Sequence, residues 1–183
     1  MHRSVALQTL NEYVTNPNLK KHMLAVEAAM RAYARKFRED EEWWGIVGLI
    51  HDFDYEKYPD IKDHPFKGAA ILKNKGWPEE MIKTVLAHAA HSGEPRDTLA
   101  KKAIFAVDEL AGFIVAVTLV KPNKKLSEVD IVSIKKKMKD KAFARPVNRD
   151  EIKQGAAELG VTLDEHITTV LQAMQTISDD LSL

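Results

Sequence analysis

Cysteine is absent from this 183-residue chain, which excludes both disulfide bonds and thiolate metal sites. Any bound metal ion must therefore be held by histidine, aspartate or glutamate side chains. A net charge of one sign is also absent, because 27 Lys and Arg residues balance 27 Asp and Glu residues. This balance disfavours nucleic acid as a partner, since no overall positive field draws phosphates to the protein.

Long apolar runs without charge are missing as well. The N-terminal residues contain no apolar signal core. The one candidate for a membrane span, residues 103–120, is short and carries Asp108 and Glu109 near its middle. Two adjacent acidic residues are costly to place in lipid. We therefore expect no membrane partner and, together with the lack of cysteine, a cytoplasmic protein.

Sustained strand alternation is a further absence. Apolar residues instead recur at helical spacing along most of the chain, which predicts an all-α fold. Pro17, Gly76 and Pro78 mark expected helix boundaries, as do the potential caps Thr98 and Asn148. The ranges predicted as helices are 4–14, 17–37, 39–52, 64–75, 79–91, 98–120, 148–160 and 163–181.

The character of the sequence changes after residue 120, where Lys121, Pro122 and Asn123 interrupt the pattern. We predict one helical domain over residues 1–120 that carries the functional site. Residues 121–183 are predicted to be a helical extension packed on the same domain. Within it, residues 127–130 resemble a capping box, and the basic segment 133–141 is interpreted as a solvated helix face.

A histidine and an aspartate, His51 and Asp52, stand at the end of the apolar run 43–50. An imidazole and a carboxylate are costly to bury unless a partner compensates them, and a divalent metal ion is a suitable partner. Asp108 has apolar neighbours three and four positions away on its helix, so it too needs a partner. That partner is a metal ion or a histidine, with a purely structural hydrogen bond as the alternative.

Five of the seven histidines fall within about seventy residues of one another. His22 follows two lysines and has an alternative interpretation as a surface residue. His88 and His91 are three residues apart, so on a helix they would share one face. His2 and His166, outside this window, are interpreted as having no role in the site.

The order and spacing of these residues resemble the HD superfamily of metal-dependent phosphohydrolases. The resemblance covers residues 18–120 and implies a helical bundle with the C-terminal residues as an added extension. It implies one or two divalent ions, chosen among Mn, Fe, Co, Ni, Zn and Mg, and a metal-bound hydroxide that attacks a phosphoester of a nucleotide or small phosphorylated metabolite. Asp52 would bridge the ions and is the catalytic candidate. The full ligand set implied is His22, His51, Asp52, His64, His88 and Asp108.

A mononuclear site with four of these residues, His22, His51, Asp52 and Asp108, is the simpler alternative. The sequence also departs from many dinuclear relatives, which have a lysine three residues after the aspartate, where this chain has Tyr55. Substrate phosphate must then be bound by other cations. The candidates for substrate binding are Arg96, Lys67 and Lys102.

Two other functions fit the same pattern. Certain di-iron oxygenases of the superfamily use a similar order of ligands, and a non-catalytic nucleotide-binding or sensor protein is the third possibility. Contact between the segment 133–141 and RNA phosphates would show as a steep dependence of binding on salt. The oligomeric state is not readable from the sequence.

Overall fold

The computed structural model describes all residues, 1–183, and contains ten α-helices, two short 3₁₀ turns and no strand. The all-α prediction is therefore confirmed. No helix combines the length and the apolar character that crossing a membrane requires. The helices are α1 (Arg3–Tyr13), α2 (Pro17–Phe37), α3 (Glu41–Ile50), α4 (Phe66–Asn74), α5 (Glu79–Leu86), α6 (Leu99–Leu119), α7 (Ile131–Lys139), α8 (Arg149–Glu158), α9 (Leu163–Gln175) and α10 (Ser178–Leu181).

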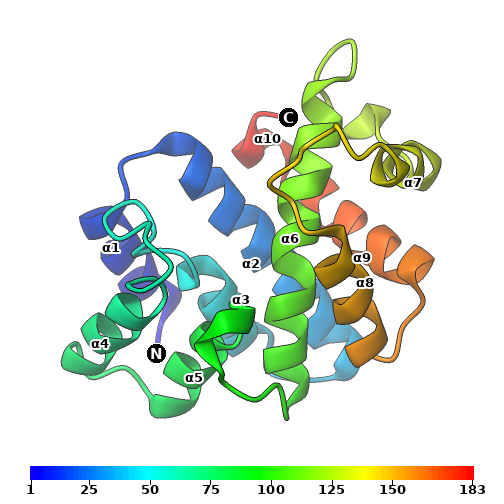
Figure 1. Cartoon of the computed structure of the whole chain (residues 1–183). Helices are drawn as coiled ribbons and strands as arrows, with labels where there is room; N and C mark the ends of the chain where they lie inside the picture. The colour runs from blue at the N-terminus through cyan, green and yellow to red at the C-terminus, as the bar shows by residue number, and fades with distance from the viewer.

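The two longest helices, α2 and α6, form the centre of the fold (Figure 1). Helices α1, α3, α4 and α5 lie to one side of α6, and α7, α8 and α9 lie to the other. Side chains cap the two central helices. Thr98, a predicted cap, accepts from the amide of Lys101, and Asn16, which was not predicted as a cap, accepts from the amides of Asn18 and Leu19. One continuous apolar core joins the helices on both sides of α6.

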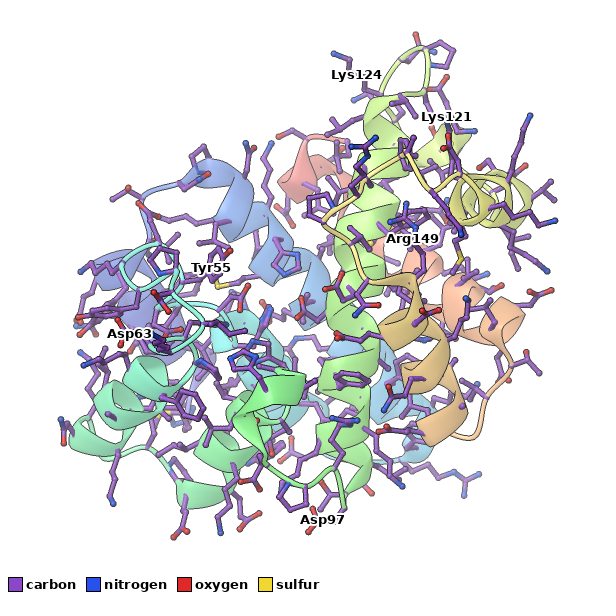
Figure 2. All side chains as sticks on the ribbon, viewed as in Figure 1. Tyr55, Asp63, Asp97, Lys121, Lys124 and Arg149 are labelled. Carbon is purple, nitrogen blue, oxygen red and sulfur yellow. The ribbon has the colours of Figure 1, made fainter.

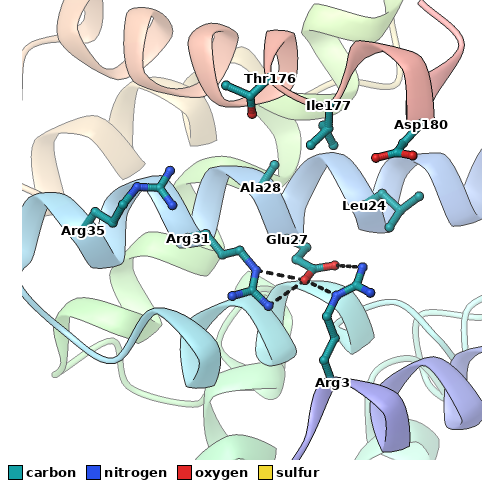
Figure 3. Close-up of a pocket in the computed structure, with 9 residues that line it drawn as sticks. All are labelled: Arg3, Leu24, Glu27, Ala28, Arg31, Arg35, Thr176, Ile177 and Asp180. Atoms are coloured by element: carbon teal, nitrogen blue, oxygen red, sulfur yellow. Dashed lines mark hydrogen bonds and ion pairs between the residues drawn. The ribbon is translucent and has the colours of Figure 1, made fainter.

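A buried carboxylate ties the N-terminal helices together. Glu27 of α2 accepts hydrogen bonds from Arg3 at 2.6 and 2.8 Å and from Arg31 at 3.0 Å, within a cavity of about 340 Å³ (Figure 3). Arg31 also pairs with Glu42, and Arg35 pairs with Glu41. Because each arginine pairs with an acidic residue, the side chains around this cavity form a structural ion-pair network with little surplus charge.

The C-terminal helices pack directly on the two central helices. In α9, the buried His166 accepts from the Tyr33 hydroxyl at 2.6 Å through Nδ1 and donates to the Ala106 carbonyl at 2.9 Å through Nε2. In α8, Gly155 lies so close to α6 that a Cβ atom there would stand 2.5 Å from the Cα of Ala106. Tight packing of this kind joins residues 149–175 to the core that carries the site.

Arg149, the first residue of α8, is one of the side chains that hold the loop between α7 and α8 in place. Arg149 donates to the carbonyls of Ala144 and Val147, each at 2.8 Å, and its guanidinium lies over the ring of Phe113. Figure 2 labels Arg149 beside α6. These contacts fix the start of α8 against α6.

Three predicted boundaries were wrong. The helix after Pro78 ends at Leu86 rather than near residue 91, because the Val85 carbonyl accepts from both the amide and Nδ1 of His88 in place of an ordinary helical amide. The last helix ends at Gln175, and α10 follows as a separate turn. The capping box opens α7 through Asp130 and Ser133 rather than over residues 127–130.

Candidate metal centre

The six predicted ligands come from five separate segments and meet on one side of α6. His22 lies on α2, and His51 and Asp52 directly follow α3. The other three lie in the loop before α4, just after α5, and on α6; they are His64, His88 and Asp108. Four of the six ligands therefore lie in or beside loops, where functional side chains are common, and only His22 and Asp108 lie within helices.

Potential ligand atoms form two groups that share one residue. In each group all the ligand atoms lie within 4.8 Å of one another. The first group contains His22, His51, Asp52 and Asp108, and the second contains Asp52, His64 and His88. Asp52 is therefore the shared member.

The two carboxylate oxygens of Asp52 face different groups. Its Oδ2 lies 3.9 Å from His22 Nε2 and 3.7 Å from His51 Nε2. Its Oδ1 lies 3.3 Å from His64 Nε2 and 3.2 Å from His88 Nε2. A carboxylate placed in this way can bridge two cations.

The first group is closed by Asp108. Its Oδ1 lies 2.9 Å from His22 Nε2 and 3.4 Å from His51 Nε2. The His51 imidazole is completely buried, and its Nε2 atom has no hydrogen-bond partner. A buried nitrogen without a partner costs free energy, and a metal ion would provide the missing one. The donors, neutral imidazole and carboxylate, suit a divalent transition ion.

Neighbouring groups set the direction in which each imidazole faces. His51 Nδ1 donates to the Gly48 carbonyl at 2.8 Å, and His88 Nδ1 donates to the Val85 carbonyl at 2.6 Å. A carbonyl oxygen only accepts, so Nδ1 carries the proton and the Nε2 lone pair is left for a cation.

His64 is oriented by a residue that the sequence analysis did not identify. The buried Asp54 lies 2.9 Å from His64 Nδ1 through Oδ1, and its Oδ2 accepts from the Gly68 amide at 2.8 Å. A Cβ atom on Gly68 would stand 2.7 Å from the Asp54 carboxyl carbon, so glycine permits this approach. The available signal was a second aspartate two residues after Asp52 in the same turn. Carboxylate, histidine and metal in this order form a common supporting arrangement in proteins.

Carboxylates and imidazoles in the cluster stabilise one another's charged forms. Burial lowers the pKa of the His51 imidazole, but the carboxylates of Asp52 and Asp108 outweigh it and raise the pKa to about 9. Burial likewise opposes the effect of Asp52 and Asp54 on His64, whose pKa also rises to about 9. Burial disfavours the charged form of Asp52, yet the imidazoles hold its pKa well below the usual range. The carboxylates thus remain anionic and favour positive charge in the cluster.

These groups open into a cavity of about 570 Å³, the site cavity. No lysine or arginine lines it. Two further acidic residues line it, Glu109 of α6 and Glu151 of α8. Asn148 links them, because its backbone amide donates to Glu109 at 3.0 Å and its side-chain amide donates to Glu151 at 2.8 Å. Burial and the neighbouring Asp108 raise the pKa of Glu109 to about 7. The remaining lining residues are His22, Asp52, Tyr55, Ile61, His64, His88, Ala89, Ala90, His91, Asp108 and Gly112.

The predicted substrate-binding cations lie outside this cavity. Arg96 forms a two-point ion pair with Glu158 at 2.6 and 2.7 Å, over the ring of Phe105, and lines another cavity together with Lys102. Lys67 is exposed on α4. The structure therefore does not bring these three side chains together with the six ligands.

The other histidines have separate positions. His91 lies in a 3₁₀ turn, contacts the His64 carbonyl at 2.9 Å and lines the site cavity, so it shares no α-helical face with His88. His2 is exposed at the start of α1, and His166 is held in the core between α2, α6 and α9.

Comparison with protein families gives one match, the HD domain, over residues 19–112. Neither the curated proteins nor the solved structures give a match to this chain. The matched range contains all six potential ligands, while Glu151 and the helices α7 to α10 lie beyond it. HD domains bind divalent metal ions and are typical of metal-dependent phosphohydrolases. Since the match spans just over half of the sequence, the chain belongs to the HD-domain family.

Proposed function

We propose that the protein is a metal-dependent phosphohydrolase that hydrolyses a phosphomonoester. The observation that carries this proposal is the position of Asp52, whose two oxygens each face a separate group of histidines. Two ions and two carboxylates would leave a formal charge of about +2, which favours a phosphate dianion.

His22, His51 and Asp108 would hold one divalent ion, and His64 and His88 the other, with Asp52 common to both. When bound, such ions supply Lewis acidity toward phosphoryl oxygens and lower the pKa of a water molecule. The surrounding residues orient this ligand set: Asp54 keeps the His64 imidazole in place, and the Gly48 carbonyl does the same for His51.

The site cavity supports phosphate chemistry in which the metal ions supply the positive charge. No lysine or arginine lines it, so a substrate phosphate has no other cation to meet there. Tyr55, in the position after the His-Asp pair where many relatives have lysine, packs edge-to-face on His64 with ring centroids 5.2 Å apart. It can contribute its hydroxyl but no charge.

The test is release of inorganic phosphate from a panel of phosphomonoesters, by protein stripped with a chelator and reloaded with Mn, Co, Ni, Zn, Mg or Fe. We expect activity to return with one or more ions and to be lost in Asp52→Ala and His51→Ala. His2→Ala, an exposed histidine outside the site, is the matched control. Metal-loaded protein that releases no phosphate from any member of the panel would contradict the proposal. Oxygen consumption by the iron-loaded protein in that case would instead favour an oxygenase.

A further inference from the structure

A second cavity adjoins the site cavity along the groove between α2 and α6. It measures about 350 Å³, and we call it the apolar cavity. Its lining residues are Asn18, Lys21, His22, Gly112, Val115, Leu119, Leu181, Ser182 and Leu183. Figure 1 shows α10 and the C-terminus beside this end of α6. No side chain among them is acidic and Lys21 is basic, in contrast to the acidic walls of the site cavity.

Two residues line both cavities, the ligand His22 and the helical residue Gly112. On α6, Asp108, Gly112, Val115 and Leu119 are separated by four, three and four residues, so they form one stripe along the helix. The stripe begins at the candidate metal centre and runs for roughly 16 Å, at about 1.5 Å per residue, to the far end of the apolar cavity.

Gly112 lines both cavities and so lies where they meet, and we call the open space beside it the passage. A Cβ atom at this position would meet no other atom within 4 Å, so packing does not require glycine here. Glycine in the interior of a helix is destabilising relative to alanine. The missing side chain therefore has no packing reason, and the space beside His22 is left free for a bound group.

We propose that the substrate is a phosphomonoester of an apolar alcohol. Its phosphate would lie at the metal centre, and its apolar part would cross Gly112 and lie against Val115, Leu119 and Leu181. Polyphosphates fit poorly, because the remaining wall of the site cavity presents Glu109 and Glu151 and no cation. Leu119 is half exposed, so an apolar group placed there would remove apolar surface from water.

This inference rests on the proposed phosphohydrolase function, and its test separates the two. Binding of non-hydrolysable ethyl, butyl, hexyl and octyl phosphonates to the Mn-loaded protein is measured by calorimetry, below micelle-forming concentrations. Each buried methylene is expected to tighten binding by up to about fourfold. Octyl phosphonate should then bind at least tenfold more tightly than ethyl phosphonate.

Gly112→Phe is designed to fill the passage without disturbing the core, because open space surrounds the Cβ position. We expect it to abolish the preference for the octyl compound, so that the affinity for octyl phosphonate falls at least tenfold more than the affinity for ethyl phosphonate. Gly112→Ala should keep most of the preference, and Val132→Phe, on the exposed face of α7, should leave it unchanged. Circular dichroism and the content of bound metal report whether each variant folds as wild type does.

Equal affinity for all chain lengths in the wild type would overturn the inference, as would a loss of ethyl phosphonate binding in Gly112→Phe equal to that of octyl phosphonate. Leu119→Asp, at the far end of the apolar cavity, should weaken only the longer compounds. If it changes the oligomeric state in light scattering instead, the cavity is a contact between copies of the chain and the inference is wrong. Binding that depends on chain length, without hydrolysis of the matching phosphates, would support the apolar binding site and contradict the proposed phosphohydrolase function.

Discussion

The two sides of α6 show how the same helix can support opposite environments. On the side covered by α8 and α9, Gly155 packs against Ala106 without space for a Cβ atom, and both nitrogens of His166 have neutral partners. On the side that carries Asp108 and Gly112, two cavities adjoin the helix. There, carboxylates and imidazoles face one another, and His51 Nε2 has no partner.

The difference concerns what a buried histidine does. His166 and His51 are both fully buried, yet burial lowers the pKa of the first to about 4, while carboxylates overcome burial and raise that of the second to about 9. Neutral partners keep an imidazole neutral and make it part of the core. Anionic partners favour a cation beside it, and either a proton or a metal ion meets that need.

The largest expected effect on the free energy of unfolding concerns the side of α6 that α8 and α9 cover. Because the pKa of His166 is about 4 in the folded protein and about 6.5 when unfolded, the unfolded state binds the extra proton between these values. The contribution of His166 to the free energy of unfolding should be fully present above pH 6.5 and should fall by about 3 kcal/mol as the pH drops to 4. Urea denaturation of wild type and His166→Gln across this range measures it. The amide of glutamine does not titrate, so the variant should lose this part of the pH dependence; equal slopes would contradict the assignment.

Metal binding on the side of α6 that carries Asp108 should stabilise the protein. An ion that binds only the folded state raises the free energy of unfolding by about 2.7 kcal/mol at a concentration one hundred times its Kd. Asp52→Ala should lose this increase, because both groups of ligands contain Asp52. Thermal unfolding with and without added metal measures the effect. An undiminished metal-dependent shift in the variant would show that the ion binds elsewhere.

A smaller effect is expected one contact away from the ligands. Asp54→Asn weakens the support of His64, which should lower metal affinity at the second group by about 10- to 100-fold and leave the first group intact. Metal analysis at limiting concentrations should then show a reduced stoichiometry. Asp60→Asn, in the same loop but exposed, is the control. Equal losses from both groups would mean that Asp54 has a general structural role.

The smallest effect compares two glycines on the two sides. Gly112→Ala should raise the free energy of unfolding by about 0.5–1 kcal/mol, because alanine favours helix and the new methyl group meets nothing. Gly155→Ala should lower it, since its Cβ would stand 2.5 Å from the Ala106 Cα. Chemical denaturation of both variants provides the measurement, and a stabilising Gly155→Ala would contradict the close packing of α8 on α6.

Local sequence patterns determined most of the helical framework. Pro17 and Asn16 begin α2, Thr98 begins α6, and Gly76, with a φ of +74°, follows the end of α4. Each of these signals acts within about one turn of the chain, which is why it is readable without the fold. The prediction failed where side chains compete with the backbone, as His88 does at the end of α5.

Some features of the site were likewise readable from the sequence, and others depended on the fold. The identities of the six potential ligands, their order and their apolar surroundings were readable from the sequence. The sequence also indicated that carboxylates and imidazoles in such surroundings need a partner. Only the tertiary structure decided that His22 and Asp108, 86 residues apart, lie in contact and that Asp54 supports His64. It also decided that Arg96 pairs with Glu158 rather than lying at the site, and that Gly112 lines a second cavity. Such contacts depend on which helix faces pack together, and that choice is made by the whole core rather than by neighbours along the chain.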